Sequence, residues 1–172
     1  KNRIYDYTIY QMYQYSNTDD TFVFSIEHEK LFINSFKIFK DNPLIGVGPN
    51  NFRKFCSKYN TVLKKQESTS NIGCSTSPHN TYLQLLSETG ILGFSLVLCF
   101  FLQISYILTK EFYYRNFRSK INFRNYEIFF FISLFISLWP FIPTGNFFNN
   151  WISIIYFLPL GFILYGNKNR KN

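Results

Sequence analysis

The chain has 172 residues, enough for one domain, and carries a net charge of +8 with 47% hydrophobic residues. Two long runs without any charge, Thr89–Thr109 and Ile128–Asn167, argue against a soluble globular protein. The positive charge is not a nucleic-acid patch, because residues 1–92 hold ten Lys/Arg against eight Asp/Glu and the other eight basic residues fall in two short segments.

The first 88 residues predict a mainly helical region. Three- and four-residue steps of apolar side chains favour a helix over Ser25–Lys40, which Asp41-Asn42-Pro43 ends. A glycine-rich turn follows, and then a short helix over Asn51–Tyr59. After a polar loop, Ser77 as N-cap and Pro78 as first helical residue predict a helix that continues to Gly90.

The uncharged runs predict about three membrane-spanning helices. A helix needs about 20 apolar residues to cross the ~30 Å hydrocarbon core, and residues 90–109 meet that length. Pro140 and the polar stretch 143–150 divide the second run into shorter spans at about 128–142 and 151–166.

Basic residues beside the spans predict the topology. They lie at 110–124, between the first two spans, and at 168–172, after the last span, and such clusters mark the cytoplasmic side. Residues 1–88 are then extracytoplasmic and residues 168–172 form a cytoplasmic tail. The fold class is therefore an all-α polytopic membrane protein in a bacterial inner membrane, with a periplasmic main loop. Because the chain starts at Lys1 without a signal-peptide pattern, we expect a C-terminal fragment that lacks upstream spans.

Two cysteines lie in the extracytoplasmic part. Cys56 and Cys74 belong to the compartment in which disulfides persist, so we expect a bridge between them. Two free thiols or a metal site are the alternatives, but metal-ligand spacing is absent from the sequence. Since no zinc motif, nucleotide-binding glycine loop or serine elbow occurs either, we expect no metal and no cofactor.

Two motifs carry a resemblance to a known family. Residues 40–53 are KDNPLIGVGPNNFR, and residues 77–93 are SPHNTYLQLLSETGILG. In this order and before a span, they resemble the O-antigen ligase/polymerase family. The matching positions are Pro43, Gly46, Gly48 and Phe52 in the first motif, and His79, Asn80, Leu83, Glu88, Gly90 and Gly93 in the second. One position departs from the family: many members have an arginine, followed by a tryptophan, at the start of the first helix, where this chain has His28 and Phe32.

The resemblance implies glycosyl transfer at the periplasmic face. The donor would be a polyprenyl-diphosphate-linked glycan, and the acceptor either lipid A–core, in a ligase, or another glycan, in a polymerase. Membrane lipids would surround the protein, and no nucleic acid would take part. A glycan exporter or flippase subunit without catalysis is the alternative from another class, but the predicted spans carry few polar residues to line a pathway.

Four residues are candidates for contact with substrate. His79 is the candidate catalytic base, because imidazole changes its charge near neutral pH. Arg53 is the candidate for binding the diphosphate, because its planar guanidinium pairs with phosphate oxygens. His28 and Asn80 are assigned to substrate binding as well. For His79, Arg53 and His28, a merely structural or solvated side chain is the alternative.

Six motif residues are expected to serve structure: Pro43, Gly46, Gly48, Glu88, Gly90 and Gly93. Glu88 follows His79 by nine residues, half a turn away on a continuous helix, so we expect it at the membrane interface and not beside the histidine. Gly46, Gly48, Gly90 and Gly93 are expected to allow special backbone geometry or close helix packing.

Overall fold

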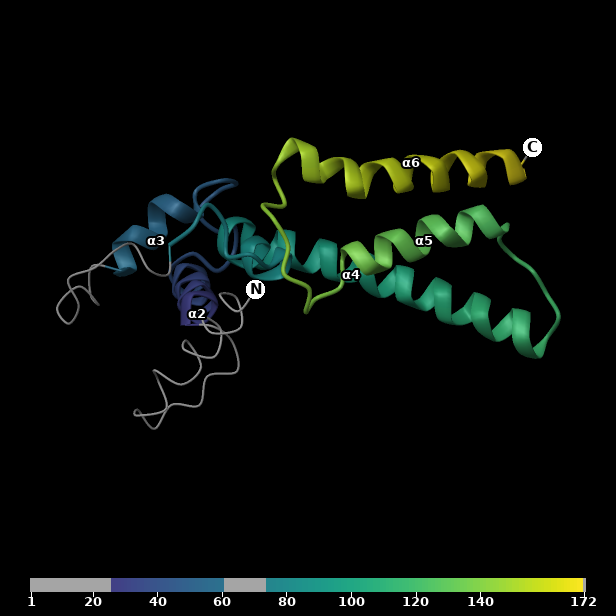
Figure 1. Ribbon diagram of the computed structural model, residues 1–172, viewed down its shortest axis with the longest axis horizontal. Coiled ribbons are helices and arrows are strands. Elements are labelled where there is room, and N and C mark those ends of the chain that lie inside the picture. Colours follow the sequence, from purple (N-terminus) through teal and green to yellow (C-terminus); the bar gives the residue numbers. More distant parts are fainter. Residues whose placement is uncertain (1–25, 61–73, 172) are drawn as a thin grey trace, which may run out of the picture.

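The protein is a helical bundle with a smaller helical head. The computed structural model describes residues 26–60 and 74–171, and in this part it contains five helices and no strand, which confirms the all-α prediction. Two helices gather at one end, and three others run side by side away from them (Figure 1).

The head is built from α2 (Ile26–Asp41) and α3 (Phe52–Asn60). Both lie within a residue or two of their predicted ranges. Leu31 and Ile38 of α2 pack against Phe52 and Cys56 of α3 in a buried apolar cluster. The C-terminal ends of the two helices are joined where the Tyr59 hydroxyl donates to Asp41. Burial, together with this hydrogen bond, raises the pKa of Tyr59 to about 12.

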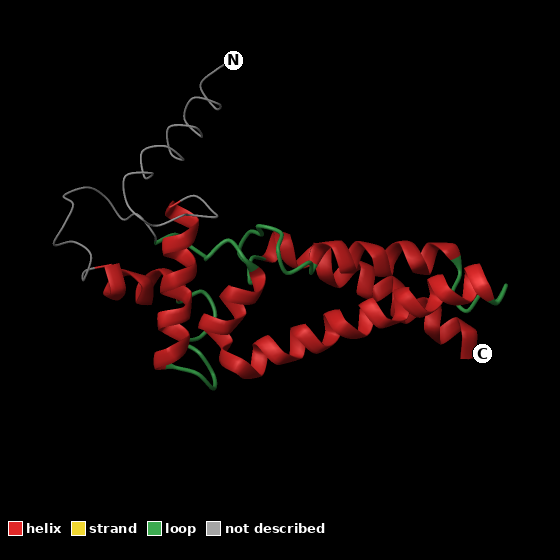
Figure 2. Ribbon diagram, turned by 90° about the horizontal axis from the view of Figure 1, so that it is seen from below, coloured by secondary structure: helices red, strands yellow, loops and turns green. Residues whose placement is uncertain are grey.

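The longest helix, α4 (Thr81–Phe117), connects the head to the bundle. It runs crosswise to α2 (Figure 2) and begins later than predicted. The expectation of Ser77 as N-cap is wrong, because His79 has a left-handed φ of 56° and Asn80 takes the cap position. The Asn80 Oδ1 atom accepts hydrogen bonds from the amides of Tyr82 and Leu83 at 3.0 and 3.1 Å.

The bundle is completed by α5 (Asn125–Ser137) and α6 (Asn150–Lys171), and α5 packs against both α4 and α6. Its buried core consists of Phe101, Ile104, Phe131, Leu134 and Leu138. Residues 168–171, predicted as part of a separate tail, form the last turn of α6. Helical hydrogen bonding simply continues beyond the apolar stretch, a boundary that hydropathy does not detect.

Among the described helices, α4 is long and apolar enough to cross a membrane. The 13 residues of α5 are apolar but give only about 20 Å of helix, and α6 contains Pro159 and a polar C-terminal end. Large apolar side chains nevertheless face outward along α6, including Trp151, Phe157 and Leu164. The structure thus agrees with a membrane protein, while the number of spans remains a prediction.

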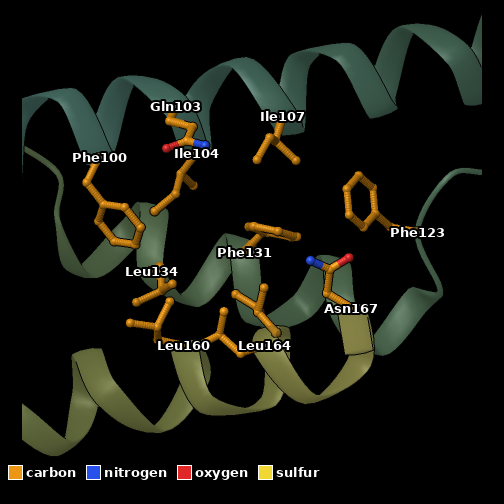
Figure 3. Close-up of a pocket in the computed structure, with 11 residues that line it drawn as sticks. Phe100, Gln103, Ile104, Ile107, Phe123, Phe131, Leu134, Leu160, Leu164 and Asn167 are labelled. Atoms are coloured by element: carbon orange, nitrogen blue, oxygen red, sulfur yellow. The ribbon is translucent and has the colours of Figure 1, made fainter. Parts of the chain in front are cut away.

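The three bundle helices enclose an apolar cavity of about 380 Å³ at the end away from the head (Figure 3). Side chains of α4, α5 and α6 line it, together with Phe123 from the loop between α4 and α5. Its polar lining comes from Gln103 and Asn167.

Candidate functional site

The structure brings the two described histidines together. The ring centroids of His28, from α2, and His79, from the segment before α4, lie 5.9 Å apart in an edge-to-face arrangement. Both side chains are half-buried. The His79 Nε2 atom lies 3.2 Å from the hydroxyl of Ser75. Two residues that the sequence assigned separately to catalysis and to substrate binding therefore form one imidazole pair.

The backbone of His79 is held from two sides. On one side, the Asn80 cap begins α4 directly after it. On the other, the amide of Thr144, in the loop between α5 and α6, donates to the His79 carbonyl at 2.9 Å. The Asn80 Nδ2 atom donates to the Pro140 carbonyl of the same loop at 2.7 Å. Both ends of the Asn80 amide are thus occupied by protein groups, and its contact with substrate remains a prediction.

The two glycine motifs dock on each other through their backbones. At Gly90, with φ 64° and ψ −162°, α4 leaves helical geometry, which frees carbonyls before the break and amides after it. Val47 and Gly48 donate to the carbonyls of Ser87 and Glu88 at 3.1 and 2.8 Å. The amide of Ile91 donates to Pro43 at 2.9 Å, and that of Leu92 to Leu44 at 3.4 Å. The turn therefore satisfies the broken helix in both directions.

This docking leaves no room for side chains at the contact. A Cβ atom on Gly46 would lie 2.3 Å from the Glu88 carbonyl carbon, and one on Gly90 would lie 2.4 Å from that of Leu44. Both glycines also have positive φ. Gly48, with φ 92°, continues the same turn, whereas Gly93 is helical and lies against Thr89. The four glycines thus lie where the backbone has positive φ or where a neighbouring residue approaches closely.

Glu88 lies inside the head and caps α3. It is fully buried, and its Oε1 atom accepts from the Phe52 amide at 2.8 Å, at the start of α3. Its Oε2 atom accepts from Gln84 Nε2 at 2.9 Å. A carboxylate here suits the positive end of the helix dipole. The spacing argument treated His79 and Glu88 as parts of one helix, but His79 precedes the Asn80 cap of α4. The expected place of Glu88 at the membrane interface remains a prediction.

Within the described ranges, no contact joins Arg53 to the histidine pair. It is the second residue of α3, its side chain is exposed, and its guanidinium takes part in none of the hydrogen bonds or ion pairs among residues 26–60 and 74–171. Its assignment to the diphosphate remains a prediction.

The disulfide lies close to the His79 segment. The structure joins Cys56 of α3 to Cys74, with 5.7 Å between their Cα atoms. Cys74 directly precedes Ser75, the partner of His79, so the bridge anchors this segment to the head.

Sequence reasoning missed a polar network that crosses the site. Gln84, fully buried, donates to Asn146 at 2.7 Å and accepts from the Phe147 amide at 2.9 Å. Asn146 in turn donates to Asn50 at 2.8 Å. The signal was present, since a glutamine among apolar helix positions and an asparagine-rich stretch between spans both need partners when they are buried.

Within the described ranges, no group of three or more possible metal ligands occurs.

Comparison with known proteins gives one match. A family model described as O-antigen ligase matches residues 7–98, more than half of the 172-residue chain. The matched range contains His28, both glycine motifs and His79, and ends within α4. No curated protein and no solved structure matches the chain.

Proposed function

Because the chain belongs to the O-antigen ligase family, we propose that it takes part in transferring a glycan from a polyprenyl diphosphate to lipid A–core. The transfer would occur at the extracytoplasmic face of the membrane, where the head lies above the bundle. A polymerase that uses a second glycan as acceptor is the alternative within the same family.

The proposed reaction needs a proton acceptor and a cation. An acceptor hydroxyl attacks the anomeric carbon, a new carbon–oxygen bond forms, and the bond from that carbon to the diphosphate breaks. His79 takes the hydroxyl proton, and the polyprenyl diphosphate leaves with the bonding electron pair. His28, by donating a ring N–H, and Arg53 would stabilise the negative charge that develops on the leaving diphosphate.

The imidazole pair is the observation that supports this assignment. His28 and His79 come from segments far apart in the sequence, yet their rings lie 5.9 Å apart. His28 occupies the place at which many family members have arginine, so a cation opposite the base is the expected chemistry. The anchoring of His79 by Asn80 and Thr144 supplies the fixed geometry that such a reaction needs.

Transfer at this face requires the head to lie outside the cytoplasm. We propose that α4 beyond Gly90, α5 and α6 cross the inner membrane, with the loop between α4 and α5 in the cytoplasm. The basic residues of that loop and the apolar side chains exposed along α6 support this orientation.

The test uses the full-length gene in a deletion host, with wild type beside His79→Ala. Lipopolysaccharide and lipid-linked glycans are separated on gels, and protein amounts are compared. We expect transfer to fall by about 10²- to 10⁴-fold, the usual contribution of a general base, at an unchanged protein level. Wild-type transfer by the variant would refute the assignment of His79.

The accumulated product separates the alternatives. Long lipid-linked polymer beside a bare core identifies a ligase, whereas single repeat units identify a polymerase. If His79→Ala instead leaves the glycan on the cytoplasmic side of the membrane, the protein exports glycans and the proposed transfer is wrong.

A further inference from the structure

A second site lies at the opposite end of the bundle from His79. The ammonium group of Lys110, on α4, lies 5.5 Å from the ring centroid of Tyr106 and 5.9 Å from that of Tyr114. Lys120, in the loop before α5, also lies 5.9 Å from the Tyr114 ring. Both lysines are within cation–π range of the same ring. They line a cavity of about 350 Å³ with Ile107, Glu111, Asn122 and Phe123.

The negative charge in this cavity is already balanced. Glu111 is buried and forms an ion pair with Arg115, with 2.8 Å between Oε1 and Nε. Its carboxylate also accepts from the Asn122 amide, from Asn122 Nδ2 and from the Phe123 amide at 3.1–3.3 Å. In the described ranges, Lys110 and Lys120 have no acidic partner. The cavity therefore presents two uncompensated cations.

The basic cavity adjoins the apolar one. Ile107 and Phe123 line both, and in Figure 3 they face each other at one end of the apolar cavity. The remainder of that cavity is lined mainly by phenylalanine, isoleucine and leucine. A cationic place that can bind an anion thus lies next to a space suited to hydrocarbon.

We propose that these two cavities together bind one anionic phospholipid. Its phosphate lies beside Lys110 and Lys120, and an acyl chain enters the cavity between α4, α5 and α6. A basic pocket between helices on the cytoplasmic side of a membrane is the setting in which acidic headgroups bind. A soluble phosphate would use the polar cavity alone and leave the larger apolar space empty. The site is independent of the transfer reaction at the head.

The test measures lipid binding to the full-length protein in detergent. The purified protein is stripped of lipid and titrated with phosphatidylglycerol or phosphatidylcholine, and bound lipid is counted by native mass spectrometry. We expect one phosphatidylglycerol to be retained in preference to phosphatidylcholine. In the double variant Lys110→Gln/Lys120→Gln, affinity for phosphatidylglycerol should fall about 25-fold, at about fivefold for each lysine.

A matched control removes two lysines from the head. Lys54→Gln/Lys58→Gln makes the same charge change on α3, and Lys58 likewise lies 5.9 Å from a tyrosine ring, that of Tyr59. This variant should keep wild-type lipid binding. The proposal is overturned by equal binding of the two lipids, by equal losses in the two double variants, or by a full-length protein that retains no lipid.

Two further arms examine the acyl chain. Inorganic phosphate at the same concentrations should not compete with phosphatidylglycerol, and effective competition would mean that the polar cavity alone is the site. Ile107→Trp places bulk between the two cavities and should weaken lipid binding while Lys110 and Lys120 remain. Unchanged binding in this variant, with unchanged melting behaviour, would exclude the apolar cavity from the site.

Discussion

At the scale of single residues, the hydrogen bonding of His79 bears on which ring nitrogen would act in the proposed reaction. Nε2 lies 3.2 Å from Ser75 Oγ, while Nδ1 has no hydrogen-bond partner in the described part of the chain. If Ser75 accepts from Nε2, the neutral ring leaves Nδ1 as the free base, because neutral imidazole carries a proton on one nitrogen only. In this tautomer, Nδ1 is the nitrogen that would take the proton in the proposed reaction, with the His28 ring as its neighbour.

We expect the charge of His28, and not its shape, to matter for transfer. His28→Ala should raise the KM for the lipid-linked donor by roughly 10- to 100-fold, the range given by losing one hydrogen bond to a charged group. His28→Arg should restore donor binding, because the guanidinium is a permanent cation that pairs with phosphate oxygens. Kinetics of the purified full-length protein measure both effects.

Two outcomes would contradict this assignment. An arginine variant as impaired as the alanine variant would show that His28 supports the fold. An alanine variant with normal donor KM but lower kcat would place His28 in proton transfer and not in donor binding.

At the scale of elements, the head is held by the interruption of a helix. The break at Gly90 exposes two carbonyls and two amides, and the turn Pro43–Gly48 pairs with all four. The sequence predicted only that one helix ends and a span begins near Gly90, and that this glycine serves backbone geometry or close packing. It did not reveal the partner, since backbone pairing leaves no side-chain pattern. The N-cap at Ser77 was also predicted wrongly, because backbone geometry is not visible in residue types. Ser77-Pro78 is a favourable start for a helix, but His79 adopts a left-handed φ, so α4 begins at Thr81 instead.

Alanine at the docked glycines should therefore destabilise the head. Gly46→Ala and Gly90→Ala each place a Cβ atom within 2.5 Å of backbone on the opposite segment. The left-handed backbone alone costs roughly 1–3 kcal/mol, and the overlap adds to this cost. We expect lower melting temperatures and less folded full-length protein, measured by size exclusion after heating.

Gly161→Ala is the matched control, because a Cβ atom there meets nothing within 4 Å on α6. It should match or slightly exceed wild-type stability, as alanine favours helix over glycine. If all three variants melt alike, the docking of the two motifs does not hold the head in place.

At the scale of the whole molecule, contacts between distant segments connect the head to the bundle. The loop between α5 and α6 reaches back to α4 through Thr144, which bonds His79, and through Asn146, which bonds Gln84. Composition and charge were enough to predict helices and a topology, since both depend on local sequence. These long-range hydrogen bonds could not be predicted from the sequence, because a buried polar residue indicates that it needs a partner but not which residue that partner is.

This architecture makes the crossing of α5 the decisive point of the topology. Its 13 residues give about 20 Å of helix against a ~30 Å core, so residues beyond Ser137 must complete the crossing. If they do, Ile121 before α5 lies in the cytoplasm, whereas Phe141 after it lies outside. Both side chains are well exposed, at 70% and 84%.

In a full-length Cys99→Ser background, a membrane-impermeant maleimide should label Phe141→Cys in intact cells. Ile121→Cys should be labelled only after permeabilisation. Equal labelling of Ile121→Cys and Phe141→Cys before permeabilisation would place both positions on one side of the membrane. In that case α5 would lie along the membrane surface. His79 and the basic loop would then be on the same side.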